Sequence, residues 1–260
     1  MPLPFTEGAP LPQVRQRGYH AAMTPNTERP WIETLPDPLP ADPLELASQW
    51  LTQARIDAAQ PNPNAMVLAT ADENGQPAAR VMLCKDIVPQ AGHIVFYTNY
   101  QSRKGRELRK NPRAAVVFHW DYRHRQVRAE GRVEPLQDEE SDAYFRTRPW
   151  QSRIGAWASR QSEPVGSRVD LGESVAAAAR RFGIAYGGPG TQEPAEVTVE
   201  IPRPPYWGGF RLQVEAIELW VEGEFRIHDR ARWTRDWRGV VKAAGAAAAP
   251  PRWMATRLQP

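Results

Sequence analysis

The spacing of apolar positions changes as the chain is followed from its first residue. Residues 1–40 contain many prolines and few regularly spaced apolar residues, which predicts a mobile N-terminal arm. Asp42 and Pro43 have the character of an N-cap and a first helical residue, and apolar residues then recur at helical spacing. This pattern predicts a helix that ends near Ala58. Residues 41–260 are expected to form a single domain.

From residue 65 onward, short β-prone apolar runs replace the helical spacing. They predict strands over residues 66–70, 79–85, 94–98, 114–120, 126–135, 210–221, 224–228 and 253–258. Capping residues and helical spacing predict helices over residues 102–110, 137–147 and 170–182, while residues 154–162 and 183–205 are expected to be loops. Together these elements predict a mainly β fold with flanking helices, built as an antiparallel barrel. A Rossmann fold is not expected, because the sequence has neither a repeated βαβ pattern nor a Gly-x-Gly-x-x-Gly motif.

Composition narrows the class of protein. With 41% apolar and 24% charged residues among 260, the chain can form a sizeable core. No apolar run approaches the about 18–20 residues of a membrane span, and the N-terminus does not resemble a signal peptide. The single cysteine, Cys84, excludes an intramolecular disulfide and a cysteine-based zinc site, and we expect no metal site. A cytoplasmic protein is the simplest interpretation.

Two basic segments are candidate anion sites. Arg80 and Lys85 lie at the two ends of one predicted strand, and strand alternation places them on opposite faces. Ser102, Arg103 and Lys104 begin a predicted helix, where free N–H groups favour a phosphate. Two cations at a helix start oppose the helix dipole unless an anion is bound there.

Two further segments extend the candidate chemistry. Tyr144 and Arg148 are four residues apart on a predicted helix, with Ser152 just beyond it, and this set could clamp a phosphate. On the predicted strand near residue 228, Arg226, His228 and Arg230 share a face, which calls for an anion or an aromatic ring opposite them. The imidazole of His228 could exchange a proton near neutral pH.

Seven sequence blocks, in order, give the chain its resemblance to a known family. They are RVMLCK (80–85), FYTN-x-x-SRK (96–104), RQVR-x-EG (125–131), YF-x-x-RP-x-x-S-x-IGAW-x-S-x-QS (144–162), WGGFR (207–211), E-x-W-x-x-G-E-x-R-x-HDR (218–230) and RL-x-P (257–260). The chain resembles the pyridoxine/pyridoxamine 5′-phosphate oxidases, which are FMN enzymes of vitamin B6 metabolism. The resemblance implies a split β-barrel of Greek-key type and a homodimer with FMN between the subunits.

The resemblance also implies roles for individual residues. FMN would be bound by Arg80, Lys85, Tyr97, Thr98, Arg103, Lys104, Gln126, Gln161, Ser162, Trp220 and Arg230. The substrate would be bound by Lys85, Tyr144, Arg148, Ser152, Arg226 and His228. Arg226 and His228 would lie over the pyridine ring as the catalytic pair. The implied reaction converts pyridoxamine or pyridoxine 5′-phosphate to pyridoxal 5′-phosphate, with O₂ as oxidant and hydrogen peroxide as product.

The sequence departs from the family pattern in several places, and other functions remain open. The family's N-terminal Arg-x-x-Tyr segment is represented only by residues 16–19, and residues 183–200 and 239–251 have the character of insertions. One alternative is a related flavin oxidase acting on another ring, such as a phenazine precursor. Another is a non-enzymatic protein that binds flavin or pyridoxal phosphate. A nucleic-acid binder is disfavoured, because the basic residues fall in small-phosphate motifs and the net charge is only +3.

Overall fold

The computed structural model describes residues 33–192, 194, 197–235 and 252–260, all of which belong to one compact unit. Most of the predicted N-terminal arm and the insertion at residues 239–251 therefore lie outside the described residues. The last residues of the arm segment, from Glu33, contact the barrel. Leu35 is buried, and its backbone N–H donates to Asp229 Oδ2 at 2.8 Å.

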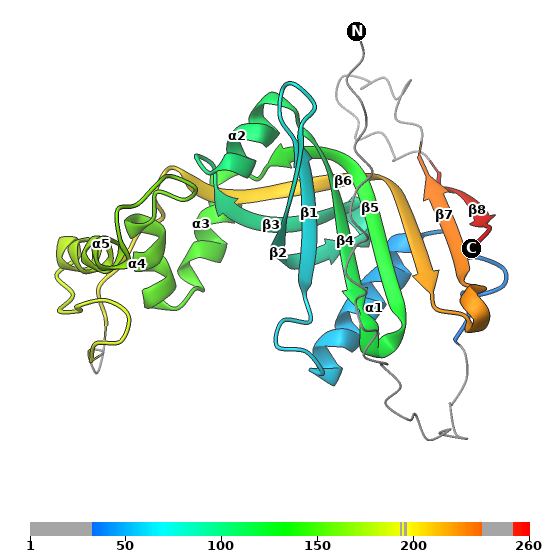
Figure 1. The fold of residues 1–260 in the computed structure, drawn as a ribbon, viewed down its shortest axis with the longest axis horizontal. Coiled ribbons are helices and arrows are strands. Elements are labelled where there is room, and N and C mark those ends of the chain that lie inside the picture. Colours follow the sequence, from blue (N-terminus) through cyan, green and yellow to red (C-terminus); the bar gives the residue numbers. More distant parts are fainter. Residues whose placement is uncertain (1–32, 193, 195–196, 236–251) are drawn as a thin grey trace, which may run out of the picture. The chain divides into compact units, whose positions relative to one another are not determined.

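Six antiparallel strands form the closed barrel that carries the site (Figure 1). They are β1 (Ala65–Ala71), β2 (Pro77–Val88), β3 (His93–Asn99), β4 (Arg113–Trp120), β5 (Arg125–Pro135) and β6 (Trp207–Val221). Neighbours pair in the order β3-β2-β1-β4-β5-β6, and β6 pairs back to β3. Two more strands, β7 (Asp229–Thr234) and β8 (Met254–Leu258), continue the sheet beyond β6. The predicted antiparallel barrel is confirmed.

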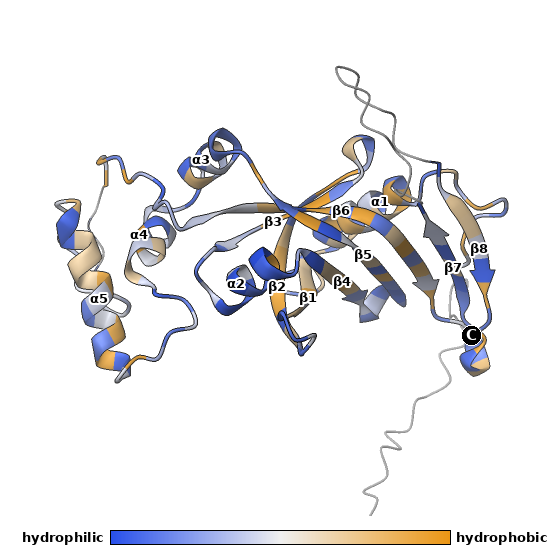
Figure 2. Cartoon of the chain, turned by 90° about the horizontal axis from the view of Figure 1, so that it is seen from above, coloured by the Kyte–Doolittle hydropathy of each residue, from blue (hydrophilic) through white to orange (hydrophobic). Residues whose placement is uncertain are grey.

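The barrel interior is filled by large apolar side chains. Phe96, Phe118 and Trp120 are buried to 1% exposure or less, and the apolar side of helix α1 (Pro43–Asp57) packs against the same cluster. The predicted start of α1 is confirmed, since the Asp42 side chain accepts a hydrogen bond from Leu44 N at 2.9 Å. Figure 2 shows the apolar residues concentrated on the barrel strands.

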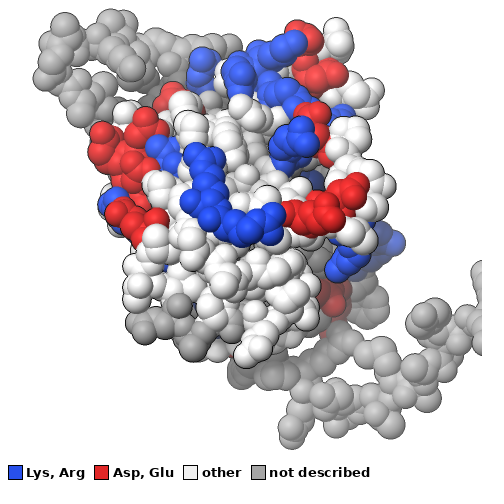
Figure 3. Space-filling view, turned by 90° about the vertical axis from the view of Figure 1, so that its left-hand side faces the viewer, with Lys and Arg blue, Asp and Glu red and all other residues white. Residues whose placement is uncertain are grey.

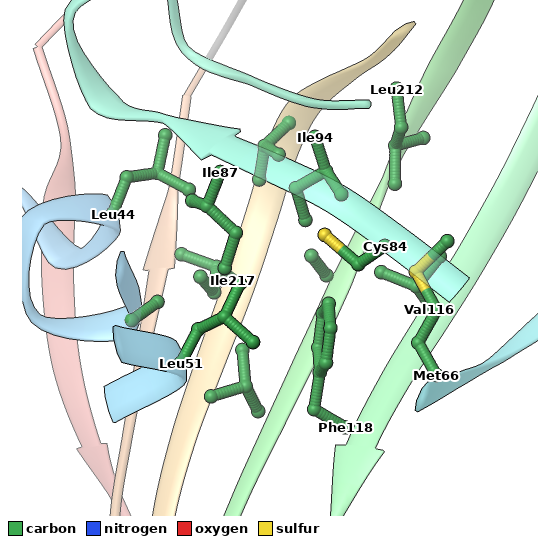
Figure 4. Packing of buried hydrophobic residues seen from close by; sticks show 14 of the residues in the cluster. Leu44, Leu51, Met66, Cys84, Ile87, Ile94, Val116, Phe118, Leu212 and Ile217 are labelled. Carbon is green, nitrogen blue, oxygen red and sulfur yellow. The ribbon is translucent and has the colours of Figure 1, made fainter. Parts of the chain in front are cut away.

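Cys84 belongs to this core rather than to any reactive site. Its sulfur lies among Ile94, Phe118 and Met66 in Figure 4, and its side chain is fully buried. Burial raises the pKa of the Cys84 thiol to about 12. The thiolate, which is the reactive form, is therefore suppressed at neutral pH.

Strand β6 connects two distant parts of the molecule. Its first half pairs with β3 and its second half pairs with β7. A bulge opposite Gly131 bends the strand, and a Cβ at that position would lie 1.8 Å from the Gln213 carbonyl oxygen, so only glycine fits. Trp207 and Trp220 are 13 residues apart on β6. At about 3.3 Å per residue, the length of strand between them is roughly 40 Å.

Four helices follow or interrupt the strands. They are α2 (Arg103–Lys110), α3 (Asp138–Arg146), α4 (Trp150–Ala158) and α5 (Arg168–Arg181). The loop predicted over residues 154–162 is wrong as far as Ala158, because this stretch belongs to α4. Pro149 stands at the start of α4, and Ile154 packs with Ala179 of α5 in a small apolar cluster. Among the described residues, no helix is long and apolar enough to cross a membrane.

The strand predicted over residues 224–228 is also wrong. Residues Glu224–Arg226 form a tight turn, and the next strand begins at Asp229. Phe225 and Arg226 have φ values of 53° and 66°, which a β-strand cannot contain. The sequence pattern predicts that Arg226, His228 and Arg230 share one strand face. This prediction is wrong, because Arg226 and His228 precede the strand that contains Arg230.

Candidate active site

A cavity of about 510 Å³ lies where strands β2 and β3 meet helices α3 and α4. Seven of the residues predicted to bind FMN or substrate line it: Lys85, Tyr97, Thr98, Tyr144, Arg148, Ser152 and Gln161. Strand alternation on β2 separates Arg80 from this group, because Lys85 lines the cavity while Arg80 is directed toward α2. The structure thus brings together residues from three separate sequence blocks.

Lys104 is the buried cation at one end of this cavity. Its ammonium donates to Thr98 Oγ1 at 3.2 Å, to Ser102 Oγ at 3.2 Å and to Gln161 Oε1 at 3.1 Å. The predicted cap is confirmed, since Ser102 Oγ also accepts from Gly105 N at the start of α2. Burial, with a smaller effect from Arg80, lowers the pKa of Lys104 to about 8.

Glu107 organises the two other cations at this end, and sequence analysis had missed it. Glu107 Oε2 lies 3.0 Å from Arg80 Nη2, and Glu107 Oε1 lies 2.8 Å from Arg103 Nε. Thr70 Oγ1 donates to the same carboxylate at 2.6 Å. The signal in the sequence is the i, i+4 spacing of Arg103 and Glu107 within a helix that has no other acidic residue.

The charges of this cluster do not balance. Arg80, Arg103 and Lys104 supply three formal positive charges, and Glu107 supplies one negative charge, which leaves +2. A phosphate monoester carries roughly −1.5 to −2 charges at pH 7. The cluster therefore fits the phosphate of a cofactor such as FMN. Ser162, predicted to join it, is exposed and has a φ of 75°.

Arg148 and Lys85 form a second group of cations in the same cavity. The Arg148 guanidinium lies 4.6 Å from the Trp207 ring centre, and its buried Nη1 has no hydrogen-bond partner among the described residues. Burial lowers the pKa of Arg148. Lys85 Nζ lies 5.3 Å from the centre of the Tyr144 ring, and no carboxylate pairs with either cation in the described part of the chain. This pair also carries +2, enough for a second phosphate.

Aromatic rings hold the walls of the cavity in place. Tyr97 stacks on Tyr144 at 4.0 Å between ring centres and on Trp207 at 5.4 Å. Phe145 meets Trp207 edge to face at 5.1 Å. Trp207, for which the sequence indicated no role, thus stacks on Tyr97 and supports Arg148.

The remaining predicted residues gather at the other end of β6. Gln126 is opposite Trp220 in the sheet, and Trp220 is opposite Arg230. The His228 ring lies 4.7 Å from the Trp220 ring. Glu218, which is almost fully buried, pairs with Arg230 at 2.9 Å. We call Gln126, Trp220, Arg226, His228 and Arg230 the turn group.

The turn fixes the proton position of His228. The backbone N–H of Gly223 donates to His228 Nδ1 at 3.2 Å, so Nδ1 is the acceptor nitrogen. A neutral imidazole with this partner carries its proton on Nε2. The Gly223 position requires glycine, since a Cβ would lie 1.7 Å from the Ile227 carbonyl oxygen.

Within one chain, the structure does not bring the turn group to the cavity. Trp207 is at the cavity and Trp220 is in the turn group, roughly 40 Å away along β6. Arg226 and the Gln126 side chain have no hydrogen-bond partner among the described residues, and Phe225 is 90% exposed. Within the turn group itself, Arg226 is exposed and the other four residues are partly buried.

The surface around the α4–α5 end carries mixed charge. Figure 3 shows basic and acidic side chains next to one another on this face, with large neutral areas between them. A nucleic-acid groove would require a continuous basic stripe with aromatic platforms. This face therefore gives no support to a nucleic-acid binder.

Comparison with known families places most of the chain. Residues 52–179 match the family described as pyridoxamine 5′-phosphate oxidase. Residues 207–260 match the pyridoxine 5′-phosphate oxidase C-terminal dimerisation region. The second match contains β6, β7 and every turn-group residue except Gln126, so the family's dimerisation region includes most of that half of the predicted site.

Individual relatives agree with these matches. A protein named pyridoxine/pyridoxamine 5′-phosphate oxidase from Bartonella henselae is 45% identical over 75% of this chain and 86% of its own length. A protein of the same name from Bordetella petrii is 47% identical over 79% of this chain and 89% of its own length. Among solved structures, PhzG from Burkholderia lata, in complex with tetrahydrophenazine-1-carboxylic acid, is similar with a TM-score of 0.69 and 28% identity, over 86% of this chain and 95% of PhzG. An FMN-binding protein from Nostoc punctiforme shares the fold, with a TM-score of 0.59 and 14% identity over 85% of this chain and all of its own. The chain belongs to the pyridoxine/pyridoxamine 5′-phosphate oxidase family.

Proposed function

We propose that this chain oxidises pyridoxamine 5′-phosphate and pyridoxine 5′-phosphate to pyridoxal 5′-phosphate, using FMN and O₂ and releasing hydrogen peroxide. The observation that carries the proposal is two separate groups of cations, each with a net positive charge, one in the lining of the cavity and one beside Thr98 and Gln161 at its end. One group suits the phosphate of FMN and the other suits the phosphate of the substrate. A flavin and a phosphorylated pyridine are the two ligands that the family's reaction requires.

FMN would be held at its phosphate by Arg80, Arg103 and Lys104, with Thr98 and Gln161 next to Lys104. When bound, FMN supplies the redox chemistry by accepting a hydride from the C4′ carbon of the substrate and passing electrons to O₂. The protein contributes placement and charge. Glu107 keeps the two arginines in fixed orientation, so their geometry is set before the cofactor arrives.

The substrate phosphate would be held by Lys85, Arg148, Tyr144 and Ser152. Binding at this remote group fixes the position of the reacting carbon, which lowers the entropic cost of reaching the transition state. His228, with its proton on Nε2, would donate a hydrogen bond to the substrate, and Arg226 would add positive charge over the pyridine ring. In this state Nε2 of His228 is not available as a proton acceptor.

The site would be completed by a second copy of the chain. The dimerisation region found in the family contains Trp220, Arg226, His228 and Arg230 of the turn group, and one chain cannot bring these residues to its own cavity. In a two-fold dimer, the turn group of each subunit can cover the cavity of the other. FMN would then lie between the subunits, with Gln126 and Trp220 of the opposite chain near its ring.

A phenazine-type oxidase is the second candidate function, because PhzG is among the similar structures. The intact second cation group favours the vitamin B6 substrates over it. A tetrahydrophenazine carboxylic acid carries no phosphate for Arg148 and Lys85 to neutralise. The named oxidase relatives are also more similar in sequence, at 43–48% identity against 28% for PhzG.

Oxygen uptake with matched phosphorylated and unphosphorylated substrates tests the proposal. The purified protein should contain FMN, and pyridoxamine 5′-phosphate should be oxidised with kcat/KM about 10²–10⁴-fold above that of pyridoxamine, since losing even two charged hydrogen bonds costs this much. Chromatography should identify pyridoxal 5′-phosphate as product. Equal kcat/KM values for the two substrates would reject the phosphate clamp, and protein that cannot be reconstituted with FMN would reject the whole assignment.

A further inference from the structure

Arg203 lies in the segment that leads into β6, outside the cavity, and its side chain is only 8% exposed. All of its guanidinium nitrogens are used. Nε lies 2.5 Å from Asp142 Oδ1, Nη2 lies 2.7 Å from Asp138 Oδ1, and Nη1 donates to the Trp207 carbonyl oxygen at 2.6 Å. A planar guanidinium that joins three acceptors fixes their relative positions more strictly than a point charge can.

The three acceptors belong to the two elements that form one wall of the cavity. Asp138 and Asp142 are one turn apart on α3, the helix that carries Tyr144 and leads to Arg148. Trp207 is the first residue of β6, and its ring lies against the Arg148 guanidinium. Figure 1 shows α3 beside the beginning of β6. Arg203 therefore connects the helix bearing the phosphate clamp to the aromatic platform beneath it.

We propose that Arg203 is a positioning residue for the substrate phosphate. By joining α3 to the start of β6, it sets the spacing between Tyr144, Trp207 and Arg148. This inference rests on the proposed function, because it assigns meaning to the wall of the proposed substrate cavity. It adds a residue that touches neither substrate nor cofactor.

A purely stabilising role explains the arrangement less well. Asp138 is 80% exposed and Asp142 is 44% exposed, and ion pairs with exposed carboxylates contribute little to stability. The α3 helix also has other anchors on β6. Ser141 Oγ accepts from Gly209 N at 3.2 Å, and Glu140 pairs with Arg211 at 2.8 Å. What Arg203 adds to these anchors is the attachment of α3 to Trp207 itself.

The test compares Arg203→Met, Arg203→Lys and Asp142→Asn with the parent holoenzyme. A displacement of about 1 Å at a binding group can cost as much as 10²-fold, so Arg203→Met should raise KM for pyridoxamine 5′-phosphate about 10–10²-fold. The parent FMN content should be retained, because the cations around Glu107 are on α2 and β2. Arg203→Lys and Asp142→Asn should each give an intermediate KM, with kcat changed less than KM in every case.

Equilibrium binding of pyridoxal 5′-phosphate provides a readout that does not depend on turnover. Its affinity should fall by the same factor as KM rises, and Lys110→Met, which removes an exposed pair with Glu73, should leave both values unchanged. If Arg203→Met fails to fold, the two milder variants carry the same test. Variants that bind and turn over like the parent would overturn this inference alone. A parent protein that neither binds nor oxidises these compounds would overturn the proposed function, and the inference with it.

Discussion

The cavity and the turn group differ in how firmly contacts within a single chain hold their side chains in place. At the cavity, Lys104 has three hydrogen-bond partners and is 7% exposed, while Tyr97, Tyr144 and Trp207 form a continuous stack. In the turn, Phe225 and Arg226 have positive φ values, and Phe225 and Ile227 are 90% and 70% exposed. The side chains of the cavity are held by contacts within one chain, whereas the turn exposes Phe225, Arg226 and Ile227.

This difference has a physical basis. A phosphate is bound most strongly by cations that are shielded from water and already held in position. Shielding strengthens the attraction between cation and phosphate, and fixed cations need not rearrange when the phosphate binds. Exposed apolar side chains on a turn with unfavourable backbone angles are stabilised when another surface covers them. This difference supports the proposal that the cavity binds the phosphorylated ligands and that the turn of a second chain completes the site.

The largest loss of activity is expected when Arg148, whose buried Nη1 has no hydrogen-bond partner among the described residues, is replaced. Arg148→Met should lower kcat/KM for pyridoxamine 5′-phosphate by about 10²–10⁴-fold, since a charged phosphate contact and its orientation are both lost. FMN should remain bound, because Arg148 is separate from the cations around Glu107. Steady-state oxygen uptake and flavin absorbance measure the two quantities. Loss of FMN together with activity would mean that the cavity does not contain two distinct phosphate sites.

Substitutions in the turn group should have a smaller effect than Arg148→Met, and they should lower kcat more than they change KM. His228→Ala and Arg226→Ala should each lower kcat about 10–10²-fold, equivalent to roughly 1.4–2.7 kcal/mol. KM should change less, because the phosphate clamp is intact, and the FMN content should equal that of the parent. Turnover at saturating substrate measures this directly. Parent-like kcat in both variants would remove the turn group from the reaction.

The smallest expected effect is a pH dependence of FMN binding. With a pKa of about 8, Lys104 in the FMN-free protein loses its proton as the pH rises through 8. Phosphate binding favours the protonated ammonium, so FMN affinity should be constant just below this range and fall by at most about tenfold per pH unit above it. Fluorescence titration of apoprotein with FMN measures the curve. Lys104→Met should bind FMN more weakly and lack the step near pH 8, and a step that persists in this variant would assign it to another group.

The sequence predicted the elements whose signals are local. Asp42 and Ser102 cap their helices as expected, and the alternation on β2 correctly separated Arg80 from Lys85. The 224–228 segment was predicted as a strand, because nothing in its residue types reveals two consecutive positive φ values. Glu107 and Trp207 gained roles only when the fold placed them beside Arg80 and Arg148. The Arg203 contacts join residues 61 and 65 positions apart, so sequence spacing could not indicate them.

The central claim is that each active site combines the cavity of one chain with the turn group of another. Subunit mixing tests it directly, by combining the nearly inactive Arg148→Met chain with the Arg226→Ala/His228→Ala double variant. In a two-fold dimer, the mixed species would contain one site with every substitution and one intact site, so equal mixing should restore about a quarter of the parent activity. If the cavity and the turn group of the same chain acted together, every site would carry a substitution. The account predicts recovery of activity on mixing, and a mixture as inactive as its components would contradict it.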